Sequence, residues 1–162
     1  MKKLALALVL ALSVFALSGC ALFGPEEETF SGTGMTIVLD DTFLVSDSVV
    51  APLFITSLKH IFMGLRETKS DALSVGIDSL SEYIEAVLDN SGHSSVTVYE
   101  SESGEYFYAY YSATVDEIEY GYMIVCMEGT SHYYLMNFGC LYKELEDNKE
   151  QYISWADTIT VE

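Results

Sequence analysis

Four segments in the second half of the chain have the residue pattern of β-strands. They are rich in Val, Ile, Tyr and Phe, and short stretches of turn-forming residues separate them. Connections this short join antiparallel neighbours, because a parallel pair needs a crossover of about a dozen residues or more. The predicted strands are Ser95–Glu100, Glu105–Thr114, Ile118–Glu128 and Ser131–Cys140.

One amphipathic helix is predicted before these strands and one after them. In the first, Ser79 and Glu82 have the spacing of a capping box, and Gly92 follows the expected end of the helix. The second is predicted from Tyr142 to Asp157, with a short extended tail behind it. The residues that form the apolar face of the first helix are Ile77, Leu80, Ile84, Val87 and Leu88.

In the earlier part of the domain, short apolar runs predict strands at Thr36–Leu39 and Phe43–Val45. The pattern of Val49–Leu65 fits both a helix and strands, and Pro52 together with the β-branched content favours two short strands that meet near Thr56. Helices on both sides of a run of antiparallel strands predict the α+β class. The expected architecture is an antiparallel β-sheet flanked by helices, an α/β/α sandwich, in a single domain over residues 35–162.

The N-terminus has the pattern of a bacterial lipoprotein signal peptide. Lys2 and Lys3 precede the apolar run Leu4–Leu17, which is too short to span a bilayer. Leu17-Ser18-Gly19-Cys20 then resembles a lipobox. We therefore predict that residues 1–19 are removed, that Cys20 carries lipid such as palmitate, and that the protein is anchored to the membrane on the extracytoplasmic side of the cell envelope. Residues 20–34 are predicted to be a flexible acidic tether.

Two further cysteines, Cys126 and Cys140, are an even pair, which in an extracytoplasmic protein suggests a disulfide. A tight turn near Gly129 would place Cys126 opposite Tyr133 or Tyr134. Cys140 would then lie roughly 20 Å farther along its strand, since a strand rises about 3.3 Å per residue. A disulfide needs Cα atoms within about 7 Å, so we expect buried free thiols.

The charge balance excludes some partners. The 162 residues contain 7 Lys and Arg against 25 Asp and Glu, a formal net charge of −18. Nucleic acid is excluded as a partner, because phosphate backbones are bound by Lys and Arg. A body this acidic is also expected to stand off an anionic bilayer on its tether.

No metal or cofactor site is predicted. His60, His93 and His132 lack the spacing of zinc ligands. Asp40, Asp41, Asp47 and Asp116 offer oxygen ligands without the spacing of a calcium loop. The negative charge nevertheless supports an alternative function as an acidic ligand-binding lipoprotein for a divalent cation or a cationic small molecule.

No catalytic motif is present in the sequence. There is no G-x-S-x-G elbow and no phosphate-binding glycine loop, and neither Cys126 nor Cys140 has a basic neighbour in sequence that would lower the pKa of its thiol. We therefore expect that the protein is not an enzyme.

The tyrosines of the strand Glu105–Thr114 are the most suggestive feature. Tyr106, Tyr108 and Tyr110 share one face of this strand, because side chains alternate between faces. Such residues are enriched at protein interfaces, which makes the three tyrosines a hypothetical interaction surface. The alternative, which we favour, is that they fill cross-strand positions beneath the helices.

Four apolar segments resemble the PsbP-like family. The resemblance implies a central antiparallel sheet between helices and a role as an accessory subunit or assembly factor of a larger complex. The leading hypothesis is thus a non-enzymatic, lipid-anchored envelope protein that acts as an accessory or protein-binding module, with an envelope protein as its partner. The segments are Met35–Leu39 with Phe43, Ser79–Tyr83, Asn137–Cys140 and Trp155–Val161.

Overall fold

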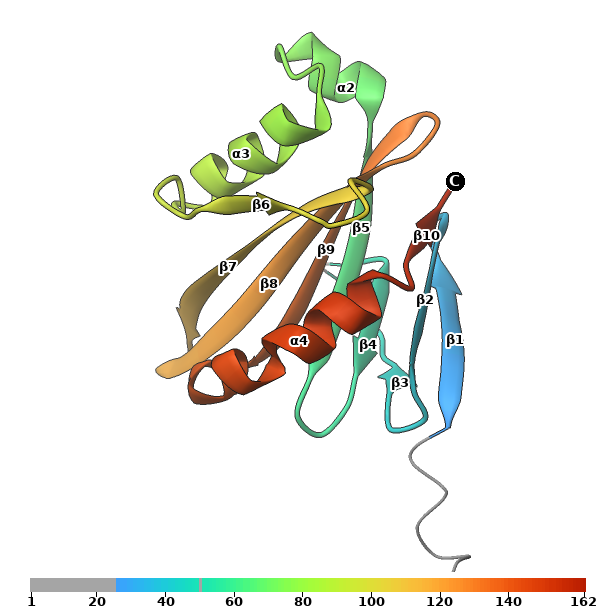
Figure 1. The fold of residues 1–162 in the computed structure, drawn as a ribbon, viewed down its shortest axis with the longest axis vertical. Coiled ribbons are helices and arrows are strands. Elements are labelled where there is room, and N and C mark those ends of the chain that lie inside the picture. The colour runs from blue at the N-terminus through green and yellow to red at the C-terminus, as the bar shows by residue number, and fades with distance from the viewer. Residues whose placement is uncertain (1–25, 50) are drawn as a thin grey trace, which may run out of the picture.

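A computed structural model describes residues 26–49 and 51–162, and its centre is a seven-stranded antiparallel sheet in the order β3-β4-β5-β9-β8-β7-β6 (Figure 1). Each of the four strands expected in the second half of the chain is present and antiparallel to its neighbours, and so are the two short strands expected around Thr56. The strands are β3 (Leu44–Val45), β4 (Leu53–Thr56), β5 (Ile61–Thr68), β6 (Val98–Glu100), β7 (Tyr106–Val115), β8 (Ile118–Glu128) and β9 (His132–Leu141).

A second, three-stranded sheet in the order β1-β2-β10 packs beside the first. It consists of β1 (Glu27–Gly32), β2 (Met35–Asp40) and β10 (Thr160–Val161). Thr33 and Gly34 have φ values of 52° and 78°, as in the two-residue turn that gives an antiparallel hairpin its twist. The expected flexible tether over residues 20–34 is therefore wrong for Glu27–Gly32, which pairs with β2 along its whole length. The predicted tail at the C-terminus also forms a strand.

Helices α2 (Lys69–Ser74) and α3 (Leu80–Asn90) lie on one side of the large sheet, and a short 3₁₀ turn, η1 (Tyr142–Glu144), leads into α4 (Leu145–Ala156) on the other. The Ser79 hydroxyl accepts a bond from the Glu82 amide at 3.3 Å. The Glu82 carboxylate accepts one from the amide of Asp78, one residue earlier than in a capping box. Helix α2 was not expected from the sequence, because six residues are too few for a helical period to show.

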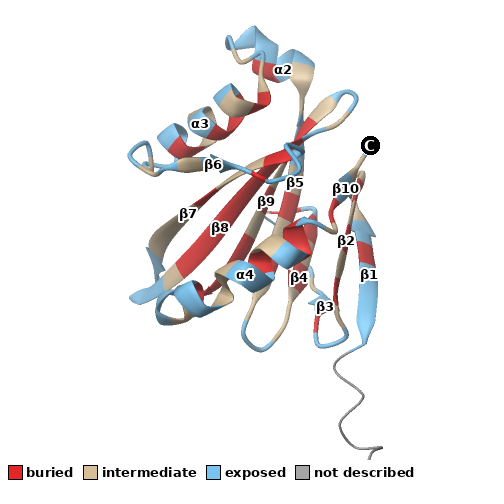
Figure 2. Ribbon diagram, viewed as in Figure 1, coloured by how far each residue is buried: buried red, intermediate tan, exposed pale blue. Residues whose placement is uncertain are grey.

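Buried residues run along the central strands of the large sheet (Figure 2), and apolar side chains pack on both of its faces. Met123 and Val125 of β8 join the larger cluster, which contains Trp155 of α4 and Ile37 of β2. Ile124, between them in sequence, belongs to the smaller cluster under α3. Alternation along one strand therefore supplies two cores, which confirms the sandwich of sheet and helices.

The two cysteines of the domain are free and buried. Cys126 lies opposite Leu135, so the expected pairing with Tyr133 or Tyr134 is wrong by one or two residues, because the hairpin turn at Gly129 is offset from the position we assumed. Cys126 belongs to the cluster under α3 and Cys140 to the cluster under α4. The sheet itself therefore separates the two thiols.

The predicted signal peptide, residues 1–19, and the predicted lipid attachment site, Cys20, lie outside the described residues. Within residues 26–49 and 51–162, no helix combines the length and the apolar character needed to cross a membrane.

Candidate interaction site

The three tyrosines of the hypothetical surface share one face of β7, but they differ in burial. Tyr106 belongs to the larger core and is only 2% exposed. Tyr108 and Tyr110 pack against the edge of that core and stay partly exposed. Tyr106 therefore lies outside the exposed surface, and its burial agrees with the favoured alternative that the tyrosines fill positions beneath the helices.

Tyr106 connects β7 to the end of α4. Its hydroxyl donates a hydrogen bond to the Asp157 carboxylate at 2.8 Å. Burial, and then this carboxylate, raise the pKa of Tyr106 well above its ordinary value. The side chain therefore stays protonated and acts as a structural donor.

A third exposed tyrosine comes from the neighbouring strand. Tyr99 of β6 lies directly opposite Tyr108 and is 47% exposed. Its ring stacks on Tyr108 with centroids 5.4 Å apart, and Tyr108 meets Tyr110 edge to face at 5.7 Å. We call Tyr99, Tyr108 and Tyr110 the tyrosine stripe. Sequence reasoning missed Tyr99, although counting back across the turn at Ser101–Gly104 would have placed it near Tyr108.

Helix α4 holds one end of the tyrosine stripe. The Lys149 ammonium lies 4.8 Å from the centroid of the Tyr110 ring and also pairs with Glu146 at 2.6 Å. Burial is the main cause that raises the pKa of Tyr110 to about 12, and the nearby Tyr108 and Glu146 add to it. At neutral pH the Tyr110 hydroxyl therefore remains a hydrogen-bond donor.

An open sheet edge continues from the stripe. Strand β6 pairs only with Phe107, Tyr108 and Ala109 of β7. In the described part of the chain, the outer edge of Tyr110–Val115 has no strand partner, while its inner edge pairs with β8. A hollow of about 380 Å³ borders this edge, between Tyr110 and Ser112 on β7 and Tyr142 and Lys149 near α4. An unpaired edge of this kind is a template for an added strand.

The surroundings of the stripe are acidic. Glu100 ends β6, Glu146 faces Tyr110 from α4, and Asp116 and Glu117 form the turn after β7. The chain as a whole carries a net charge of −18. A surface of this sign is complementary to Lys and Arg on a partner.

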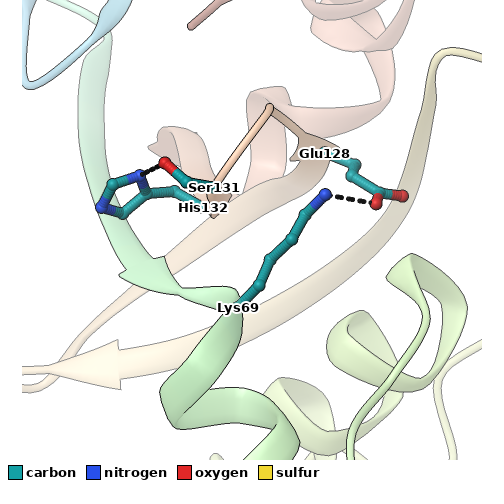
Figure 3. Close-up of polar contacts among 4 residues, drawn as sticks. All are labelled: Lys69, Glu128, Ser131 and His132. Atoms are coloured by element: carbon teal, nitrogen blue, oxygen red, sulfur yellow. Dashed lines mark hydrogen bonds and ion pairs between the residues drawn. The ribbon is translucent and has the colours of Figure 1, made fainter.

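The hairpin between β8 and β9 contains a hydroxyl–imidazole contact, but its geometry is that of a surface turn. The Ser131 hydroxyl and His132 Nδ1 are 2.9 Å apart, while Lys69 of α2 pairs with Glu128 (Figure 3). Among the contacts of the described residues, no carboxylate bonds to His132 in the way that a catalytic triad requires. The ion pair between Lys69 and Glu128 joins the start of α2 to the hairpin.

The acidic residues considered as cation ligands lie in separate turns. Asp40 accepts bonds from the amide and the hydroxyl of Thr42 in the turn after β2. Asp116 and its neighbour Glu117 have positive φ values of 49° and 65° in the β7–β8 turn. Within the described residues, no group of three or more His, Cys, Asp or Glu side chains is arranged to hold a metal ion. No observation here favours the cation-binding alternative.

The sequence matches no protein-family model and no curated protein. The fold, however, is similar to that of cyanobacterial PsbP from Synechocystis, with a TM-score of 0.58 at 12% identity over 88% of this chain and 96% of that one. It is also similar to the Ran-binding protein Mog1p of Saccharomyces cerevisiae, with a TM-score of 0.54 at 7% identity over 85% and 96% of the two chains. A protein of Bacteroides thetaiotaomicron matches with a TM-score of 0.54 at 5% identity, over 86% of this chain and 49% of its own. The chain thus has a PsbP-like α+β fold.

Proposed function

We propose that the protein is a non-enzymatic, lipid-anchored accessory protein of the cell envelope that binds another protein through the tyrosine stripe and the open edge of β7. The observation that carries this proposal is the adjacency of the two features. Tyr108 and Tyr110 are held at the rim of the core, and the unpaired backbone of β7 begins at Tyr110. Aromatic side chains and open backbone groups together suit an extended protein segment.

The contacts within the stripe support a role in binding. Each ring is fixed by a neighbour before any partner arrives, Tyr108 by Tyr99 and Tyr110 by Lys149. Fixed side chains lose little rotamer freedom on association, so more of the contact energy remains as affinity. The acidic surroundings favour a partner segment that carries Lys or Arg. Mog1p, whose fold is similar, is a Ran-binding protein, which is consistent with a protein-binding role here.

Site-directed photocrosslinking in the membranes of cells that make the protein tests the binding surface. A photoreactive phenylalanine analogue replaces Tyr108, and a matched variant carries it in place of Tyr120, a partly buried tyrosine on the other face of the sheet. We expect a discrete adduct from position 108 that is lost when Tyr99 and Tyr110 are changed to Ala. Equal adducts from both positions, or none from position 108, would exclude the stripe as the binding surface.

The proposed anchor is tested separately. Cys20→Ala should abolish both the lipid and the cleavage after Gly19, because the lipobox ends at this thiol and the acyl chains are attached to it. Mass spectrometry of the N-terminal peptide should show a lipid on Cys20. An N-terminal peptide that carries no lipid would refute the anchor and leave the stripe hypothesis standing.

A further inference from the structure

Several loops converge at the end of the molecule where the described chain begins. The Asp41 amide donates a hydrogen bond to the Glu26 carbonyl at 2.8 Å, so the first described residue lies beside the turn after β2. The β4–β5 and β7–β8 turns and the end of β9 reach the same end of the large sheet, which is the lower end in Figure 1. We call this the loop end.

The loop end exposes apolar side chains from each of these segments. Leu58 is fully exposed at the tip of the β4–β5 turn, at 105% relative exposure. This position is fixed, because the Ser57 amide donates to the His60 carbonyl at 2.8 Å and the Ser57 hydroxyl accepts from the His60 amide at 3.1 Å. The exposed apolar residues of the loop end are Leu44, Val45, Leu58, Val115, Ile118, Leu141 and Tyr142.

The opposite end of the sheet has a different character. There Lys69 pairs with Glu128, and the amide of Thr130 in the β8–β9 hairpin donates to the Glu162 carbonyl at 2.9 Å. The exposed apolar residues on that side, Leu73 and Val75, lie on and just after the single helix α2. At the loop end, by contrast, exposed apolar side chains come from one turn tip, at Leu58, and from strand ends beside the other turns, such as Val115 and Ile118. Exposed apolar residues gathered from several segments at one end of a molecule indicate a contact surface.

We propose that the loop end contacts the lipid bilayer, with Leu58 seated at the boundary between headgroups and acyl chains. This inference rests on the proposed anchor at Cys20. Because β1 takes up Glu27–Gly32, only the short segment from Cys20 to Glu26 connects the lipid to the domain. At about 3.6 Å per residue, that segment of seven residues spans about 25 Å at most. The chain therefore holds the loop end, and not the α2 end, against the membrane.

The charged residues of the loop end limit how deeply this end enters the bilayer. Asp116 and Glu117 form the tip of the β7–β8 turn, and Glu144 lies near Leu58; these carboxylates are repelled by anionic headgroups. Lys59, next to Leu58, has no ion pair among the described residues and is available to a lipid phosphate. Contact should therefore be strongest on a zwitterionic bilayer and weaken as anionic lipid is added at low salt.

The test uses the full lipidated protein in phosphatidylcholine vesicles. An environment-sensitive fluorophore is attached through Leu58→Cys or Ile118→Cys, and through Leu73→Cys as the matched control at the α2 end, where Leu73 is 62% exposed. The native thiols Cys126 and Cys140 are buried, so unmodified protein serves as the labelling blank. Nitroxide-bearing lipids then report proximity to the bilayer, and flotation reports anchoring.

The inference expects quenching at positions 58 and 118 to exceed that at position 73 at least threefold, and to fall when phosphatidylglycerol is added at low salt. Floating protein with equal quenching at all three positions would overturn the inference and leave the anchor intact. Quenching at position 58 with none at position 118 would also overturn the inference, because the whole loop end must face the bilayer. Protein that does not float would refute the anchor and the inference together.

Discussion

The two faces of the seven-stranded sheet are covered in different ways. On one face, α3 closes over Ile124, Cys126 and Tyr133, and its own Ile84 is fully buried. On the other, α4 and the three-stranded sheet share the cover, and the outer strands β6 and β7 extend past α4. Tyr108 and Tyr110 therefore remain partly exposed, while Ala109 between them has no exposed surface. Strand β7 thus contributes side chains to a closed core on one face and partly exposed tyrosines on the other.

The covered part of the α4 face should be the most sensitive region. Phe138 is buried, and its ring lies 5.1 Å from that of Phe62, 5.3 Å from that of Tyr152 and 6.1 Å from that of Trp155. Phe138→Ala should lower the free energy of unfolding by about 3–5 kcal/mol, because it removes a large apolar contact and leaves a cavity. Urea denaturation measures the loss, with Phe138→Leu as the milder control. Equal midpoints for the two variants would contradict the packing described here.

The α3 face should respond less, and more locally. Ile84→Ala should cost about 2–4 kcal/mol. Because α3 is a single helix between two loops, the substitution should speed amide exchange in α3 before it speeds exchange in β8, which the other face also supports. Urea denaturation and site-resolved hydrogen exchange check both parts. Uniform acceleration across α3 and β8 would mean that the two faces open as one unit.

Two matched Tyr→Phe variants compare how much a buried and a partly exposed tyrosine on the same face contribute to stability. Tyr106→Phe removes the hydrogen bond to Asp157 and should cost about 1 kcal/mol. Tyr108→Phe should cost less than about 0.5 kcal/mol, as is usual for surface positions. Thermal denaturation of the two variants compares them directly. A larger loss from Tyr108→Phe would show that the stripe is part of the core.

The sequence predicted those features of the fold that depend on local pattern. The alternation in β7 to β9 and the cap at Ser79 each left a signal within a few residues. What it missed depends on pairing and packing partners, which the local pattern of a segment does not show. Glu27–Gly32 has the pattern of an acidic linker because four of its six residues are polar and exposed, and it forms a strand because β2 pairs with it. Tyr106 and Tyr108 have the same local pattern, and only the position of α4 buries one and exposes the other.

The smallest expected effect concerns His60, at the loop end of the α4 face. Its ring packs against both Phe43 and Trp155, and its Nδ1 lies 3.1 Å from the Tyr152 hydroxyl. Burial lowers the pKa of His60 below 6.5, although the charges of Asp40 and Glu144 oppose the shift.

The sign of the pH effect follows from that lowered pKa. The unfolded chain takes up the proton first as the pH falls, so folding stability is complete above about pH 6.5 and declines below it. His60→Gln removes this titration and should flatten the dependence of the free energy of unfolding on pH between about 7.5 and 5.5. The unmodified protein, measured under the same conditions, gives the reference slope. A slope unchanged by His60→Gln would mean that the ring is protonated as easily in the folded protein as in the unfolded chain, and that the aromatic cluster does not exclude the charge.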